Sequence, residues 1–257
     1  MSRTVNSYTI NHTFTTTDKA TNIKGMLEKI VNSNERLSMR EVDGNTSLLC
    51  DYRIKYSSAP NLEVSFRAVS NNNFAAAKLF LIDPETTTEI TSNLIMNTSS
   101  SYLAVQSVVE NVVINVIEID DAAIYINIST KGRSKCSFMF SPFVNYFTNE
   151  RINGLIWVTW GSSGSGTSDA YTEKDVTASI AKVYIGGDSY PGGNSIASPR
   201  FFASSSANFY GYVVDPEFLY TIWNGSSLFA PDSAMFRTSL GGYTFTHLGA
   251  GLFARLD

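Results

Sequence analysis

The chain is poor in charged residues, histidine and cysteine. Only 16% of its 257 residues are charged, against a usual share of about a quarter. His12 and His247 are its only histidines, so general-base catalysis by an imidazole would have to use one of them. Cys50 and Cys136 allow at most one disulfide, and together with two distant histidines they show no zinc-ligand spacing. We therefore expect two buried free thiols, no metal site and no disulfide-stapled scaffold.

The chain also lacks the segments that would direct it to a membrane or to secretion. It has no run of about eighteen apolar residues, the length that crosses a bilayer. Residues 1–5 contain no apolar stretch of the kind that a signal peptide needs. The net charge of −4 and the pI near 5.3 argue against a nucleic-acid partner, which requires a basic face. We expect a protein made in the cytoplasm, with neither a membrane nor a nucleic acid as its partner.

Serine, threonine, asparagine and aromatic residues take the place of the missing charges. Aromatics reach 12%, and aromatic and β-branched residues joined by polar turns are typical of strands. Turn signals recur about every 8–12 residues. The sequence predicts a mainly β fold of sandwich or barrel type with one N-terminal amphipathic helix. A seam at 148–153 indicates a helix-plus-β region over 1–150 and a β-sandwich-like region over 151–257, with a single domain as the alternative.

The helix is predicted from one apolar stripe that follows a capping residue. Asp18 is suited to the N-cap, and apolar residues recur behind it at helical spacing until 32–34 ends the run. The stripe consists of Ala20, Ile23, Met26, Leu27, Ile30 and Val31. Gly25 costs the helix about 1 kcal/mol relative to alanine, which is a defect unless another segment packs closely against it.

Strands are predicted where apolar and polar residues alternate between turn signals. A hairpin is expected over 37–42 and 46–56, because Asp43-Gly44 supplies the positive φ angles of a tight turn. Segment 62–68 also alternates, and its Glu63, Ser65 and Arg67 predict one solvated face. Further strands are predicted over 78–82, 112–119 and 123–128 (around Asp120-Asp121), 155–160, 179–185, 209–214, 218–223 and 243–247.

The glycine-rich segment 161–167 comes closest to a nucleotide-binding or nucleophile motif, and it fails both tests. Gly161 and Gly166 have the spacing of a Walker loop, but Thr167 stands where the phosphate-binding lysine belongs. Ser165 occupies the second glycine position of a Gly-x-Ser-x-Gly elbow. We therefore expect no catalytic, cofactor-binding or metal-ligating residue, and no cofactor.

Two segments, 161–175 and 186–199, exceed the usual connection of about two to six residues. Long loops in compact domains tend to be functional. We expect these two to supply contact surface. The predicted contact residues are Gly161, Gly164, Gly166, Asp169, Gly187, Asp188, Tyr190 and Gly193.

The texture of the whole chain resembles that of virion structural proteins of tailed bacteriophages, from the tail, neck, baseplate or fibre region. The shared features are few charges, strands rich in Ser, Thr, Asn and aromatics, and an apolar, strand-like end over 240–257. No functional residue transfers from this resemblance. It implies a virion protein that is not an enzyme and that assembles as a ring or trimer with itself and with other virion proteins.

Two other function classes stay open. A carbohydrate-binding β module could stack a sugar on Trp157, Trp160, Trp223 or Tyr190. A glycoside hydrolase could use the carboxylates of Asp120-Asp121 or of 215–217. Both acidic pairs and the tryptophans also have simpler interpretations, as turn residues and as core.

Overall fold

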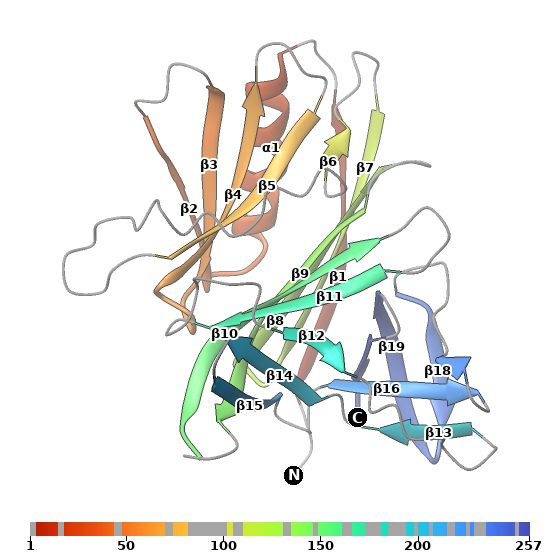
Figure 1. Cartoon of the computed structure of the whole chain (residues 1–257). Helices are drawn as coiled ribbons and strands as arrows, with labels where there is room; N and C mark the ends of the chain where they lie inside the picture. The colour runs from red at the N-terminus through yellow and green to blue at the C-terminus, as the bar shows by residue number, and fades with distance from the viewer. Residues whose placement is uncertain are drawn as a thin grey trace. The chain divides into compact units, whose positions relative to one another are not determined.

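A computed structural model of the chain describes residues 4–14, 18–43, 48–69, 74–81, 102–104, 110–130, 135–145, 149–160, 166–172, 181–184, 194–197, 200–205, 208–214, 219–224, 227–228, 235–249 and 252–257. In these residues the chain is mainly β, with antiparallel sheets and one helix (Figure 1). The predicted fold class is confirmed.

The largest sheet closes on itself at one end. Its strand order is β1 (Val5–Phe14), β7 (Glu110–Ile119), β8 (Ala123–Thr130), β9 (Lys135–Asn145), β10 (Arg151–Trp160), β11 (Gly166–Thr172), β12 (Ala181–Tyr184), β14 (Arg200–Ser205) and β15 (Asn208–Val214). In addition β15 pairs with β9, with Val213 opposite Val144. The strands from β9 to β15 therefore form a closed ring, and β1 is left as the free end of the sheet.

The two smaller sheets are open. One has the order β13 (Asn194–Ala197), β16 (Leu219–Asn224), β20 (Leu252–Arg255), β19 (Tyr243–Gly249) and β18 (Arg237–Leu240), with β17 (Ser227–Leu228) beside β16. The other has the order β2 (Leu37–Glu41), β3 (Leu48–Tyr56), β4 (Leu62–Val69), β5 (Phe74–Leu81) and β6 (Tyr102–Ala104).

The chain divides into two compact units. Unit 1 takes Met1–Ser7, Ile117–Tyr125 and Ser137–Asp257, and unit 2 takes Tyr8–Val116 and Ile126–Cys136. The boundary predicted between 150 and 151 falls between β9 and β10, which are hydrogen-bonded neighbours in the largest sheet.

The predicted helix is α1 (Lys19–Asn32). The Asp18 side chain accepts hydrogen bonds from the backbone N–H groups of Ala20 and Thr21, which satisfies donors that the first turn leaves unpaired. The side chains of Ile23, Met26, Leu27 and Ile30 are fully buried, and the helix packs on β2, β3 and β4. Both the helix and its core-facing stripe are confirmed.

Gly25 lies inside the helix because His12 packs closely against it. A Cβ atom at this position would lie 3.3 Å from Cε1 of His12, on β1. The missing side chain therefore lets β1 approach the helix, and the lost helix propensity is offset by this packing.

The turns follow the predicted chemistry where the structure describes them. Strands β2 and β3 pair antiparallel, with Leu37 opposite Tyr56. Asp120 and Asp121 adopt φ values of 50° and 57° in the three-residue connection from β7 to β8, where the Ala122 N–H donates to the Ile119 carbonyl at 3.0 Å. Positive φ at both central residues is what a type I′ turn requires. The strand-like C-terminal segment is β20, whose Leu252, Phe253 and Ala254 are buried within the chain itself.

We expect Ile30→Ala to lower the free energy of unfolding by about 2–5 kcal/mol, because it opens a cavity between α1 and the sheet. Glu28→Ala, on the exposed side of the same helix, should change it by less than about 0.5 kcal/mol. Urea unfolding followed by circular dichroism measures both. Equal stabilities of the two variants would contradict a core-facing helix.

Candidate functional site

The structure places a strand inside each of the two predicted contact loops, β11 within 161–175 and β13 (Asn194–Ala197) within 186–199. Gly166 and Asp169 belong to strand β11, where Gly166 pairs with Trp160 and Asp169 with Trp157. The prediction of one continuous loop from 161 to 175 was therefore wrong over 166–172, because these residues form a hairpin with β10, whereas 161–165 and 173–175 lie outside the described residues. The remaining predicted contact residues, Gly161, Gly164, Gly187, Asp188, Tyr190 and Gly193, lie outside the described residues.

A second correction concerns the polar face of β3 and β4. Glu63, Ser65 and Arg67 were expected to face solvent, yet Glu63 and Ser65 are buried and the Arg67 side chain is only 15% exposed. On the neighbouring strand Asp51 and Arg53 are buried as well. The sheet therefore buries an apolar face against α1 and a charged face on its other side, and the charges must satisfy one another.

Asp51 is the centre of this charged face. Arg53 donates to both of its carboxylate oxygens, Nε to Oδ1 at 3.3 Å and Nη2 to Oδ2 at 2.9 Å. Arg67 donates to Oδ2 from Nε at 2.9 Å, and the Ser65 hydroxyl donates to Oδ1 at 2.5 Å. The strand register produces the arrangement, because Arg67 lies directly opposite Asp51 and Ser65 opposite Arg53.

Glu63 extends the network to the edge strand β2. Arg40 donates to it through Nε at 2.8 Å and Nη2 at 2.6 Å, a bidentate geometry that fixes both side chains. The Arg40 side chain is 44% exposed, whereas that of Glu63 is 2% exposed. Arg53 Nη1 lies 3.8 Å from Glu63 Oε2. Three arginines thus enclose two buried carboxylates.

The electrostatics of Asp51 indicate a structural role. Burial alone would raise the pKa of its carboxyl, but the hydrogen bonds from Arg53, Ser65 and Arg67 outweigh that effect and hold the pKa below its ordinary value. Both carboxylate oxygens are already bonded to protein donors. Asp51 is therefore an ionised structural group and is not placed to accept a proton from a substrate.

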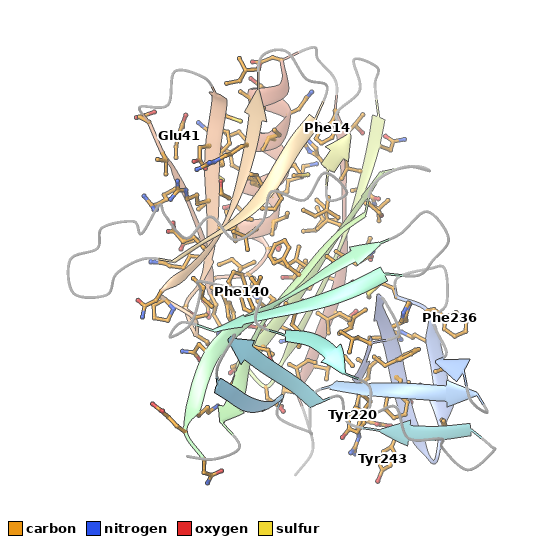
Figure 2. All side chains as sticks on the ribbon, viewed as in Figure 1. Phe14, Glu41, Phe140, Tyr220, Phe236 and Tyr243 are labelled. Carbon is orange, nitrogen blue, oxygen red and sulfur yellow. The ribbon has the colours of Figure 1, made fainter. Side chains whose placement is uncertain are left out.

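A different surface lies on unit 1, on the sheet of β16, β18, β19 and β20. The strand register puts one set of side chains on a common face, which we call the aromatic face. It consists of Tyr220, Tyr243, Phe245, His247, Phe253 and Arg255. Phe245, His247 and Phe253 are fully buried at its centre. Figure 2 shows Tyr220 and Tyr243 at one end of the sheet and Phe236 at the other.

Large apolar side chains are exposed at both ends of this sheet. Tyr243 is 43% exposed and Phe236 is 41% exposed, among the most exposed large apolar side chains that the structure describes. Tyr243 follows the turn at Gly241 and Gly242, whose φ values of 61° and 84° suit a two-residue hairpin. That turn projects the tyrosine from the end of the sheet.

Arg255 is held in place over the exposed end. Its guanidinium carbon lies 3.8 Å from the centre of the Tyr243 ring, a cation–π contact. It hydrogen bonds to Tyr220, and its Nε donates to Oδ1 of Asp257 at 3.4 Å. Asp257 is itself positioned, because its Oδ2 accepts from the backbone N–H of Thr244 at 3.0 Å. The tyrosine and the arginine are therefore presented in one fixed geometry.

Both histidines pack as structural side chains. His247 is buried with its ring 4.9 Å from that of Phe253. His12 packs edge-on against Phe14, 5.5 Å away. Burial and then the charge of Lys29 lower the pKa of His12, against a backbone hydrogen bond at Asn22 that raises it, so the imidazole is neutral near pH 7. That neither histidine acts in catalysis stays a prediction.

The other candidates are placed only in part. Asp120 and Asp121 form the hairpin turn described above, and the segment 215–217 lies outside the described residues, as does Tyr190. Trp157 and Trp160 belong to β10 and Trp223 to β16. Cys50 is a buried free thiol, as expected, and burial raises its pKa to about 11. The described residues contain no cluster of three or more metal-ligating side chains.

Comparison with known proteins finds no relative. No protein-family model, curated protein or solved structure matches the chain significantly. No helix in the described part of the chain is long and apolar enough to cross a membrane.

We expect Asp51→Asn to destabilise the chain by about 3–5 kcal/mol, because it leaves the buried charge of Arg53 without its carboxylate. Lys24→Ala removes an exposed ion pair, 3.9 Å from Glu41, and should cost less than about 1 kcal/mol. Chemical unfolding at pH 7 compares the two, and equal losses would contradict the structural role of Asp51.

The lowered pKa of Asp51 also gives a pH dependence. Its stabilising contribution is fully present above the unfolded-state pKa of about 3.9. It is lost as the pH falls through the lower pKa of the folded state. We therefore expect the stability gap between the wild type and Asp51→Asn to narrow below about pH 4. A gap that stays constant down to pH 2 would argue that packing, and not charge, is responsible.

Proposed function

We propose that the chain is a structural component of a tailed-bacteriophage virion and acts there as a self-assembling or adaptor subunit. The proposal combines the resemblance in sequence texture with the mainly β fold. The observation that carries it is the exposed end of the aromatic face, where Tyr243 lies 43% exposed beneath the guanidinium of Arg255.

That end has the chemistry of a protein-binding surface. Aromatic residues and arginine are the side chains most enriched where protein interfaces gain their free energy. Holding Arg255 through Tyr220, Asp257 and the Tyr243 ring lowers the conformational entropy that binding would otherwise cost. Arg255 covers one face of Tyr243, so a sugar could stack only on the other face. We therefore favour a protein partner over a carbohydrate.

The test uses purified phage particles from the source of the chain. We expect mass spectrometry to find the chain in the particles, and Tyr243→Ser to lower its incorporation by about ten-fold or more, the loss of one interface hot spot. Arg237→Gln is the matched control, because Arg237 is exposed on the same hairpin and lies on the opposite face of the sheet. Absence of the chain from particles, together with binding to a glycan array, would favour the sugar-binding alternative.

A further inference from the structure

The free edge of the largest sheet is β1, whose own sequence lacks the charged residues and prolines that usually protect a sheet edge. Sheet edges are normally protected by short length, by lysine or other charges, by proline or by bulges. β1 is ten residues long, and its sequence VNSYTINHTF contains no charged residue and no proline. At the other end of this sheet, residues 212–214 of β15 pair with β9.

The edge strands of the two smaller sheets are protected in the usual ways. β2 has five residues and carries Arg40 and Glu41. β18 has four residues, starts at Arg237 and follows Met235, whose φ is 64°. β6 and β13 have three and four residues. Among the described edges, β1 alone is long and uncharged.

The pairing of β1 with β7 shows which backbone groups point outwards. The Asp120 N–H donates to the Thr4 carbonyl at 2.9 Å. Further along, the Thr9 hydroxyl reaches Asn115 at 2.9 Å and the Thr13 hydroxyl reaches Asn111 at 3.0 Å. The register between β1 and β7 is therefore constant, without a bulge. In this antiparallel register the even-numbered residues bond to β7, and the backbone groups of Thr9, Asn11 and Thr13 point away from it.

Those outward groups have one partner among the described residues. Lys29, from α1, donates to the Asn11 carbonyl at 2.9 Å. The side chains of Thr9, Asn11 and Thr13 are exposed, whereas Tyr8, Ile10 and His12 are partly buried on the other side of the strand. A strand that pairs here would replace a single exposed hydrogen bond, which contributes only about 0.5–1.5 kcal/mol.

We propose that β1 pairs antiparallel with β1 of a second copy of this chain, with Asn11 opposite Asn11. The segment Tyr8–Phe14 is self-complementary in this register. Tyr8 would face Phe14, Thr9 would face Thr13, and Ile10 would face His12. Aromatic and Thr–Thr pairs are favourable across antiparallel strands, and with a neutral imidazole no like charges meet. The two-fold pairing joins the two large sheets into one, and the inference rests on the proposed function of self-assembly.

Proline at an outward position tests the pairing. Asn11→Pro removes an N–H that only the second copy would use, so the bonds from β1 to β7 are kept. Ser239→Pro is the matched control, because Ser239 has the same outward position in edge strand β18. In sedimentation equilibrium of the full chain, we expect Asn11→Pro to raise the dimer dissociation constant about ten-fold or more and Ser239→Pro to leave it unchanged.

A charge pair tests the register even where proline would disturb folding. T9K/T13K places like charges opposite each other across the two-fold axis, whereas T9K/T13E places opposite charges there. Both double variants lose the same hydrogen bonds to Asn115 and Asn111. We expect T9K/T13K to dissociate and T9K/T13E to dimerise at least as tightly as the wild type.

The outcomes separate the two proposals. If Asn11→Pro assembles like the wild type at an unchanged melting temperature, or if both charge variants assemble alike, the β1 pairing is wrong while self-assembly stands. A wild-type chain that stays monomeric at high concentration refutes the pairing and self-assembly together. Assembly that occurs only after another particle protein is added shows that the second copy is the wrong occupant of the edge.

Discussion

The pairing of β15 with β9 is the constraint that leaves β1 as the free edge of the largest sheet. A sheet closed into a ring has no edge to offer, and a sheet left open has two. Here the ring removes one end of the nine-stranded sheet and leaves β1 as the other. The growth of the sheet by another strand is thereby confined to one place, and the chemistry of the residues at that place decides what can bind.

The buried charges on the face of β3 and β4 that points away from α1 have a different cause. Strands β3 and β4 are covered on both faces, but their alternating sequences supply an apolar set of side chains for only one face. The second face buries Asp51 and Glu63, and arginines surround both carboxylates. Such a network contributes little net free energy compared with an apolar core, yet it disfavours any other strand register, since a slip would leave a charge buried without a partner.

Local patterns predicted the elements whose causes are local. The stripe behind Asp18 predicted α1, and Asp120-Asp121 marked a turn because these residues accept positive φ values. Alternation in 62–68 predicted a strand, but it could not show that the polar face would be covered, since the partners of Glu63 come from β2 and β3. The alternating Tyr8, Ile10, His12 and Phe14 carry a strand signal in β1 that the polar residues between them obscured. Closure of the ring depends on residues about seventy positions apart, which no local window contains.

The contact between Lys29 and Asn11 bears on the proposed pairing of β1, because an incoming strand would have to replace this hydrogen bond. Lysine is the common guard of sheet edges, but in this chain it is supplied by the helix and not by the strand. A lysine on β1 itself would hinder every incoming strand, because its side chain would project beside the edge. Lys29 holds only one carbonyl and has a flexible stem, so an incoming strand can replace its hydrogen bond with a ladder of several. A pairing that forms only one or two hydrogen bonds does not offset the loss of the bond from Lys29 to Asn11. Pairing of the whole of Tyr8–Phe14 does. In the proposed dimer, the helix would thereby favour pairing of the whole of Tyr8–Phe14 over partial pairings.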